Sequence, residues 1–167
     1  PRNHPLRQGK GSMYEGGLRV PFIAVGPRIK SGSQSRVPVT GLDLFPTLAE
    51  LAGYAKPLPK SLDGGSLTRL LRNQGQGAVQ RSNSFLLFHQ AVARTAQTAL
   101  IHGDYKLVKT WRGNRLELFD LSKSVEEDIN LAEKLPDKTE KLHRLMTGYL
   151  DNVGAETRKI TTKKANQ

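Results

Sequence analysis

A lysine framed by glycines is the feature near the start of the chain that could do chemistry. Lys10 lies between Gly9 and Gly11, and the pair Gly16-Gly17 follows within the same short run. Glycine allows a backbone to approach a ligand closely or to take a positive φ. An ammonium group is a compact charge with three donors, which suits an anionic oxygen whose charge grows in a transition state. Composition alone favours a surface turn with a solvated lysine, because glycine-rich loops with a lysine are common and this run does not have the spacing of a Walker phosphate loop.

Several charged or titratable side chains surround this lysine. Arg7 carries a guanidinium group that could reach an anionic substrate, and a structural salt bridge is the preferred alternative. Glu15 and Arg19 could pair with each other or with the backbone around the glycines, and we expect them to hold the loop in shape. His4 could line the same pocket, although a lone histidine in a loop is usually solvated.

The segment that follows predicts the edge of an α/β layer. Residues 20–25 form a short apolar run, which indicates a strand that is buried on both faces, as in a parallel sheet. Asp43 can cap a helix that runs to about Ala52, with Gly53 just past its end. A strand followed by a helix is typical of such an edge.

The second half of the chain has a different pattern, which predicts a small α+β subdomain. Short β-type runs occupy residues 84–89, 98–101, 105–111 and 115–121, and residues 112–114 suit a hairpin turn. Asp137 then caps a helix with Glu140 at its third position, and Gly154 ends it. One helix laid over an antiparallel meander would bury the apolar faces of both.

The composition is that of a globular protein with a strongly basic balance. The 167 residues carry a formal net charge of +11, which predicts an anionic partner or neighbour. The basic residues are scattered and form no stripe with interleaved aromatics, so we expect no nucleic-acid partner. No apolar run approaches the length of a membrane span, and we expect no membrane partner. With no cysteine, the chain cannot contain a disulfide, a zinc thiolate or a cysteine nucleophile.

The run from Pro5 to Pro21 resembles the segment in which sulfatases keep the lysine that grips the sulfate. Tyr14-Glu15-Gly16-Gly17 and Arg19-Val20-Pro21 follow the lysine at the spacing of that family. Further resemblances to sulfatases, in the same order, lie at residues 43–53, 62–71, 87–89, 99–108, 117–121 and 130–132. Together they cover roughly residues 1–154.

This resemblance implies a fold and a division of the chain. The fold would be the C-terminal portion of the α/β alkaline-phosphatase-like (sulfatase) fold, with the edge of the large α/β domain plus a small α+β subdomain that has an antiparallel sheet and a long C-terminal helix. The edge of the catalytic domain would span residues 1–72 and a linker residues 73–83. The subdomain would span residues 84–154, and a basic tail residues 155–167.

The resemblance also implies a chemistry that this chain would only complete in part. The chain would be the C-terminal part of a sulfatase that hydrolyses a sulfate ester, with Lys10 binding the sulfate and helping to fix the hydrated aldehyde nucleophile. A calcium ion and a formylglycine would both lie in the upstream part, and no metal would bind to this segment alone. The implied partners are the N-terminal catalytic portion of the same protein and a sulfated substrate such as a carbohydrate. The implied location is periplasmic, secreted or lysosomal.

His89 closes an apolar strand, where it could project toward the substrate. Many sulfatases carry a histidine after an aromatic residue at this place, often followed by Pro-His, whereas Gln90-Ala91 follows here. A hydrogen-bonded structural histidine at a strand end is the alternative interpretation. We expect His102 and His143 to be surface residues.

Two other functions remain open from the sequence. A phosphodiesterase or phosphonate hydrolase of the same superfamily would share the fold, because the superfamily accepts phosphoryl and sulfuryl esters alike. A non-catalytic module that binds nucleic acid or a sulfated glycan would also fit the basic charge.

Overall fold

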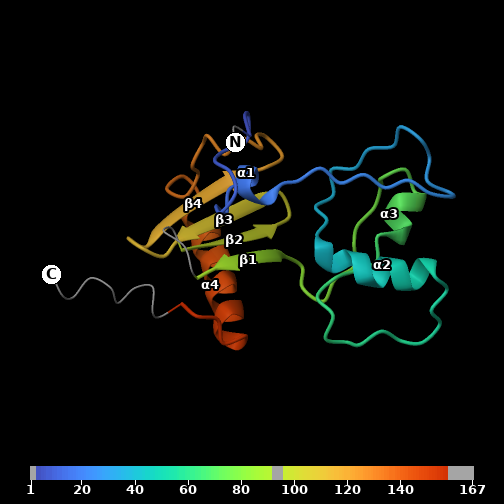
Figure 1. Ribbon diagram of the computed structural model, residues 1–167. Helices are drawn as coiled ribbons and strands as arrows, with labels where there is room; N and C mark the ends of the chain where they lie inside the picture. The colour runs from blue at the N-terminus through green and yellow to red at the C-terminus, as the bar shows by residue number, and fades with distance from the viewer. Residues whose placement is uncertain (1–2, 92–95, 158–167) are drawn as a thin grey trace. The chain divides into compact units, whose positions relative to one another are not determined.

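The structure is a computed structural model that describes residues 3–91 and 96–157. It divides the chain into two compact units (Figure 1). Unit 1 joins Pro1–Val20 to Phe85–Gln167, and unit 2 is Pro21–Ser84. The segment up to residue 72 was expected to form one piece, whereas Met13, Tyr14 and Leu18 pack with the C-terminal sheet. Residues 158–167 of the expected basic tail lie outside the described residues.

Unit 1 contains the predicted antiparallel meander. Its strands, β1 (Leu86–Gln90), β2 (Gln97–His102), β3 (Tyr105–Thr110) and β4 (Arg115–Asp120), pair in chain order. The turn predicted at residues 112–114 joins β3 to β4. The N–H of Asn114 donates to the carbonyl of Trp111 at 3.2 Å, which closes the turn, and Gly113 in its centre has a positive φ of 83°. The predicted meander and its turn are therefore confirmed.

Side chains alternate between the two faces of the sheet along each strand, so each face carries apolar side chains. Both faces are covered by other segments of unit 1. Helix α4 (Pro136–Asn152) packs against one face (Figure 1), where Leu100, Leu107 and Leu118 meet its apolar side chains. The segment that contains the short helix α1 (Glu15–Leu18) covers the other face. There Met13 and Tyr14 pack with a second buried cluster, Ala99, Val108 and Phe119. The run next to Lys10 is thus part of the core of unit 1.

Helix α4 begins one residue earlier than the predicted cap. Pro136 occupies the first turn, where its fixed φ is compatible with the helix and its missing N–H is not needed. Asp137 therefore lies inside the first turn, and the predicted capping role of Asp137 is wrong. The predicted partner in that cap, Glu140, pairs with Arg144 at 2.8 Å instead. The end of the helix at Gly154, with a φ of 64°, is confirmed.

Unit 2 has little regular structure. It contains a 3₁₀ turn η1 (Gly41–Asp43), helix α2 (Leu44–Leu51) and helix α3 (Thr68–Arg72). The strand predicted at residues 20–25 is not formed: the segment pairs with no described strand. Its side chains are exposed, Ile23 by 85% and Val25 by 92%. A strand exists only through hydrogen bonds to a neighbour, and no described part of the chain supplies one.

Asp43 precedes α2, as predicted, but its carboxylate does not cap the helix. Arg81 donates two hydrogen bonds to that carboxylate, at 2.8 and 2.7 Å. The N–H groups of Gly65 and Thr40 donate to the same carboxylate at 2.9 and 2.8 Å. Burial acts to raise the pKa of Asp43, but Arg81 and the two N–H groups outweigh burial and hold that pKa below its ordinary value. Asp43 therefore ties three segments of unit 2 together.

Candidate functional site

Lys10 lies at the corner of a tight turn. The N–H of Ser12 donates to the carbonyl of Gly9 at 3.1 Å, which places Lys10 and Gly11 in the central positions. Gly11 has a φ of 88°, the sign that a type II turn requires at its third residue. The side chain of Lys10 is exposed and has no hydrogen-bond or ion-pair partner among the described residues. The turn therefore presents a free ammonium group.

Gly16 and Gly17 allow α1 to lie directly against this turn. A Cβ at Gly16 would collide with the backbone carbonyls of Arg7 and Gln8, and one at Gly17 with the carbonyl of Ser12. The N–H of Gly16 donates to the carbonyl of Arg7 at 3.0 Å across this contact. These two glycines permit close approach of the chain's own backbone, whereas approach to a ligand stays a prediction.

Arg7 is engaged by the protein on three sides. Its guanidinium pairs with the carboxylate of Glu117 at 3.1 Å and donates to the carbonyl of Glu127 at 3.0 Å. The guanidinium carbon also lies 4.1 Å from the centre of the Tyr14 ring, a cation–π contact. These contacts favour the structural salt bridge over a role in binding an anionic substrate.

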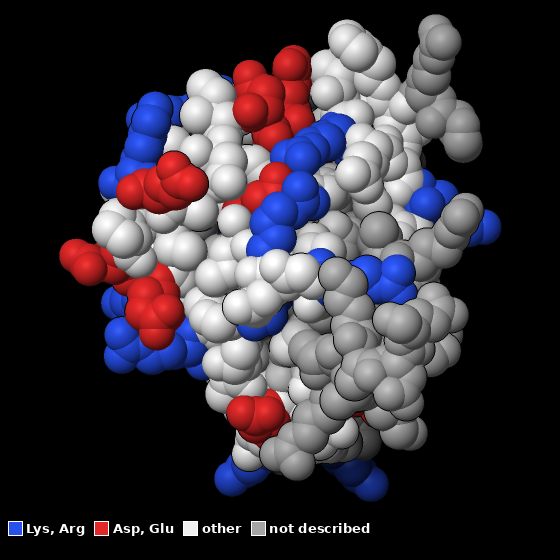
Figure 2. Space-filling model, turned by 90° about the vertical axis from the view of Figure 1, so that its left-hand side faces the viewer, with Lys and Arg blue, Asp and Glu red and all other residues white. Residues whose placement is uncertain are grey.

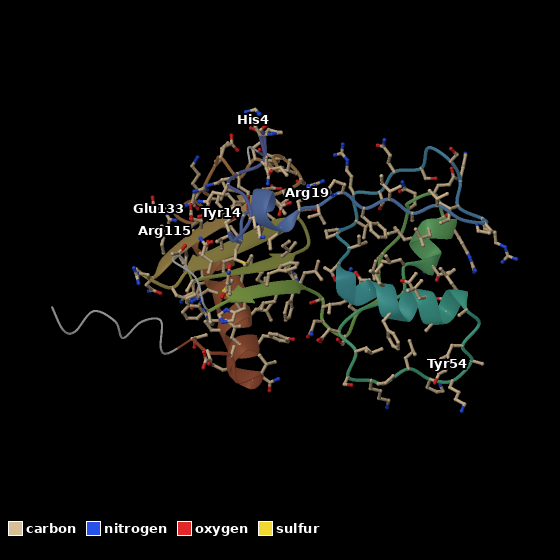
Figure 3. All side chains as sticks on the ribbon, viewed as in Figure 1. His4, Tyr14, Arg19, Tyr54, Arg115 and Glu133 are labelled. Atoms are coloured by element: carbon tan, nitrogen blue, oxygen red, sulfur yellow. The ribbon has the colours of Figure 1, made fainter. Side chains whose placement is uncertain are left out.

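Tyr14 joins the run around Lys10 to the sheet of unit 1. Its ring is fully buried, and its hydroxyl donates to the carboxylate of Glu117. Burial, together with the bond to Glu117, raises the pKa of Tyr14 to about 12, so the hydroxyl keeps its proton near neutral pH. Arg115 donates to the same hydroxyl at 3.3 Å, and the labels of the two side chains lie close together in Figure 3.

Glu15 and Arg19 form the expected pair only weakly, at 3.5 Å, because Glu15 has a nearer partner. The ammonium of Lys106 lies 2.8 Å from the carboxylate of Glu15 and 2.8 Å from that of Glu127. Burial raises the pKa of Glu127, and the charge of Lys106 opposes that rise. The loop is thus held by a charged cluster on its inner side.

The sequence did not reveal Lys106, Glu117 or Glu127 as members of this cluster. One signal was present for Lys106: it is separated by one residue from Val108, an apolar strand position, so the two share a face of β3. No comparable local signal marks Glu127, which lies in the connection after β4.

His89 lies on the opposite face of the sheet from the Lys10 turn. Its neighbour Phe88 packs with the cluster under α1, so alternation directs His89 toward the α4 face. Its Nδ1 lies 2.7 Å from the hydroxyl of Thr98, and its ring meets the Trp111 ring edge to face at 6.1 Å. Burial lowers the pKa of His89, so the ring is neutral near pH 7. These contacts favour the structural interpretation of His89.

The other histidines lie apart from this cluster. His4 is exposed in the first described residues of the chain, and Figure 3 shows it at the outer end of unit 1. His102 was expected at the surface, but it is half-buried at the end of β2. His143 was expected at the surface, but it is half-buried, with its Nε2 2.7 Å from the ammonium of Lys109. His143 of α4 is therefore joined to a lysine of β3.

Among the described residues, no group of side chains forms an evident metal site. Within residues 3–91 and 96–157, no three His, Cys, Asp or Glu side chains lie close enough to hold one metal ion. The described residues therefore do not fit a calcium site. In the same part of the chain, no helix is long and apolar enough to cross a membrane.

Comparison with known proteins decides the family. The model of the family "N-sulphoglucosamine sulphohydrolase, C-terminal" matches residues 8–155. The chain belongs to this sulfatase family. It is 32% identical over 150 residues to arylsulfatase K of Xenopus laevis, covering 85% of the chain and 28% of that protein. It is 34% identical over 145 residues to a sulfatase of Formosa agariphila, covering 80% of the chain and 26% of that protein.

Solved structures agree on the fold of this sulfatase chain. The structure of Ps i-CgsB in complex with k-i-k-neocarrahexaose matches with a TM-score of 0.74 at 24% identity, over 89% of this chain and 32% of that one. The predicted fold is confirmed: the chain has the C-terminal portion of the alkaline-phosphatase-like sulfatase fold, and unit 1 is its small subdomain of sheet and long helix. The chain spans between a quarter and a third of the length of these proteins.

Proposed function

We propose that this chain is the C-terminal part of a longer sulfatase and that Lys10 binds the sulfate group of its ester substrate. The calcium ion and the formylglycine nucleophile would both belong to the upstream portion. The substrate would be a sulfate ester such as a sulfated carbohydrate, and the protein would act in a periplasmic, secreted or lysosomal location. The family membership of the chain supports the reaction class.

One observation carries the role of Lys10. Every charged neighbour within the run is occupied: Arg7 by Glu117, and Glu15 by Lys106. Lys10 alone in this run presents an exposed charge with no partner among the described residues. A cation held on a fixed turn and left uncompensated by the protein is suited to an anionic group that arrives from outside.

The upstream portion of the same protein is the partner that we propose for unit 2. Phe45, Leu48 and Leu51 on α2 are exposed by 58, 62 and 50%, and residues 20–25 lie extended beside no described strand. Parallel strands buried on both faces have the near-continuous apolar pattern of residues 20–25. The relatives are several times longer than the chain, so they contain the residues that could cover these side chains.

Nucleic acid is a poorer partner for the basic charge. Figure 2 shows one face of the molecule, on which Lys and Arg side chains are interspersed with Asp and Glu side chains. A surface that tracks a phosphate backbone needs a continuous field of one sign. The mixed face instead supports the proposal of an enzyme part over that of a nucleic-acid module.

Steady-state kinetics of the full-length protein on an aryl sulfate test the role of Lys10. We expect Lys10→Ala to lower kcat by about 10²- to 10³-fold, because it removes a charge that acts on the developing negative charge of the transition state. Lys134→Ala is the matched control, since Lys134 is also exposed and has no partner among the described residues. Activity of Lys10→Ala close to wild type would contradict the assignment. A preference of the wild type for an aryl phosphodiester or an aryl phosphonate ester would favour the phosphodiesterase or phosphonate hydrolase alternative.

A further inference from the structure

Lys106 is a fully buried lysine in the middle of a sheet, and its surroundings are informative. Its side chain and that of Glu127 are both 0% exposed, and that of Glu15 is 8% exposed. Burying a charge is costly unless it is paired, so this cluster is retained at an energetic cost. Its three members come from β3, from α1 and from the connection after β4, which are far apart in the sequence.

Glu127 contacts the Lys10 turn on both sides of the lysine. Its backbone carbonyl accepts the hydrogen bond from Arg7, three residues before Lys10. Its carboxylate accepts a hydrogen bond from the N–H of Glu15 at 2.6 Å, five residues after Lys10. The Lys106 ammonium pairs with the same carboxylate and with that of Glu15. Lys106 therefore pairs with the carboxylate of Glu15 and with that of Glu127, the residue that contacts the run on both sides of Lys10.

We propose that Lys106, with Glu15 and Glu127, is a positioning residue for Lys10. The cluster fixes the base of the turn on β3, so that the exposed ammonium of Lys10 is held in one place instead of moving with a surface loop. This inference rests on the proposed function of Lys10. It assigns a second role to the small subdomain: its sheet is the rigid support of a substrate-binding side chain.

Lys109 provides a matched control on the same strand. It is also buried, at 5% exposure, and lies three residues from Lys106, so alternation places it on the opposite face. Its ammonium contacts His143 of α4 and lies 4.7 Å from the centre of the Trp111 ring. Replacing either lysine by methionine removes a buried charge from β3, but only Lys106→Met frees the contacts of the turn.

Hydrogen exchange of the full-length protein tests the support directly. We expect Lys106→Met to speed amide exchange in the peptide that covers residues 7–19, while Lys109→Met leaves that peptide as protected as in the wild type. Unchanged protection of residues 7–19 in folded Lys106→Met would overturn the proposal. The same loss of protection in Lys109→Met would also overturn it, because the effect would then be general to the sheet.

Kinetics separate positioning from stability. We expect Lys106→Met to lower kcat on an aryl sulfate by up to about 10²-fold with little change in KM, because a displaced Lys10 acts mainly on the transition state. The control Lys109→Met should keep kcat near wild type. Equal losses of kcat in the two variants would contradict a specific role for Lys106.

A second substitution, at Glu15, tests the same cluster. If Lys106→Met does not fold, Glu15→Gln replaces it, since Gln keeps the shape of the side chain and leaves Lys106 its pair with Glu127. Glu15→Gln should change exchange and kcat in the same direction as Lys106→Met, and no change in either would overturn the proposal. A wild type without sulfatase activity would refute the proposed function, whereas the exchange measurement needs no turnover and would still judge the support of the turn.

Discussion

The two units of the chain bury their apolar side chains to very different extents. In unit 1, α4 and the segment around Tyr14 cover both faces of the sheet. In unit 2, Leu67 and Leu70 are the buried large apolar side chains among the described residues. Nine of the twelve large apolar side chains that are exposed in the described residues belong to unit 2, namely Phe22, Ile23, Val25, Leu42, Leu44, Phe45, Leu48, Leu51 and Tyr54. We call unit 1 closed, because its own segments cover both faces of its sheet. We call unit 2 open, because many of its large apolar side chains are exposed among the described residues, as is typical of a surface that binds a partner.

The placement of Lys10 gains meaning from this difference. The motif that carries it lies in the closed unit, fastened to a sheet that needs no other part of the protein to be covered. The open unit follows directly and holds the apolar surfaces that we assign to the contact with the upstream portion. The side chain that we propose to bind the substrate and the surface that we propose to contact the upstream portion thus belong to different units.

The largest loss of stability should come from a substitution in the core of unit 1. Phe119 is 1% exposed and packs under Tyr14, with the two ring centres 6.2 Å apart. We expect Phe119→Ala to lower the free energy of unfolding by about 3 to 5 kcal/mol, because it leaves a cavity between the sheet and the Lys10 run. Chemical denaturation of the full-length protein measures it. Val153→Ala, at an exposed position of the same unit, is the control, and equal losses in the two would mean that the core of unit 1 is misassigned.

A medium effect is expected from the open unit, if the upstream portion covers it. Phe45 of α2 and Ile129 of unit 1 have the same exposure, 58%. In the full-length protein we expect Phe45→Ala to cost about 1 to 3 kcal/mol, the range for removing a buried apolar side chain, and Ile129→Ala to have little effect. Thermal denaturation of the two variants compares them. Equal, small shifts in melting temperature would show that α2 faces solvent and would remove the contrast between the units.

What could be predicted from the sequence follows the same division. The meander, its turn and α4 depend on alternation, on Gly113-Asn114 and on helical spacing, which are local patterns whose partners lie within the chain. The strand at residues 20–25 failed because its pattern describes burial that no described residue provides. A local pattern gives a correct structure only where the chain also contains what the pattern must pack against.

The candidate site was predicted less completely than the fold. Lys10, its glycines and the loop-holding role of Glu15 came from a contiguous motif, but Lys106 and Glu127 lie 91 and 112 residues from Glu15. Asp43 shows the same limit: its position before a helix indicated a cap, whereas its carboxylate pairs with Arg81, 38 residues away. Ion pairs between distant residues depend on the tertiary fold, which local spacing does not encode.

The smallest effect distinguishes the units by the sign of their pH dependence. The pKa of Asp43 in unit 2 is lowered on folding, so its contribution to stability is present above its unfolded pKa and is lost as pH falls through the lower, folded value. The pKa of Glu127 in unit 1 is raised, so the folded state keeps a proton that the unfolded state has released, and stability falls as pH rises through the window above its ordinary value. We expect Asp43→Asn to flatten the loss of stability in acid below the ordinary pKa of aspartate, and Glu127→Gln to flatten the decline above the ordinary pKa of glutamate.

Denaturation of the full-length protein across this pH range measures both slopes. Glu133→Gln, at an exposed position with no hydrogen-bond or ion-pair partner among the described residues, should leave both slopes unchanged. If Glu127→Gln flattened the acid side instead, the carboxylate would be ionised and stabilised by Lys106 in the manner of Asp43 by Arg81, and the two buried clusters would be alike in their electrostatics although they differ in what they hold.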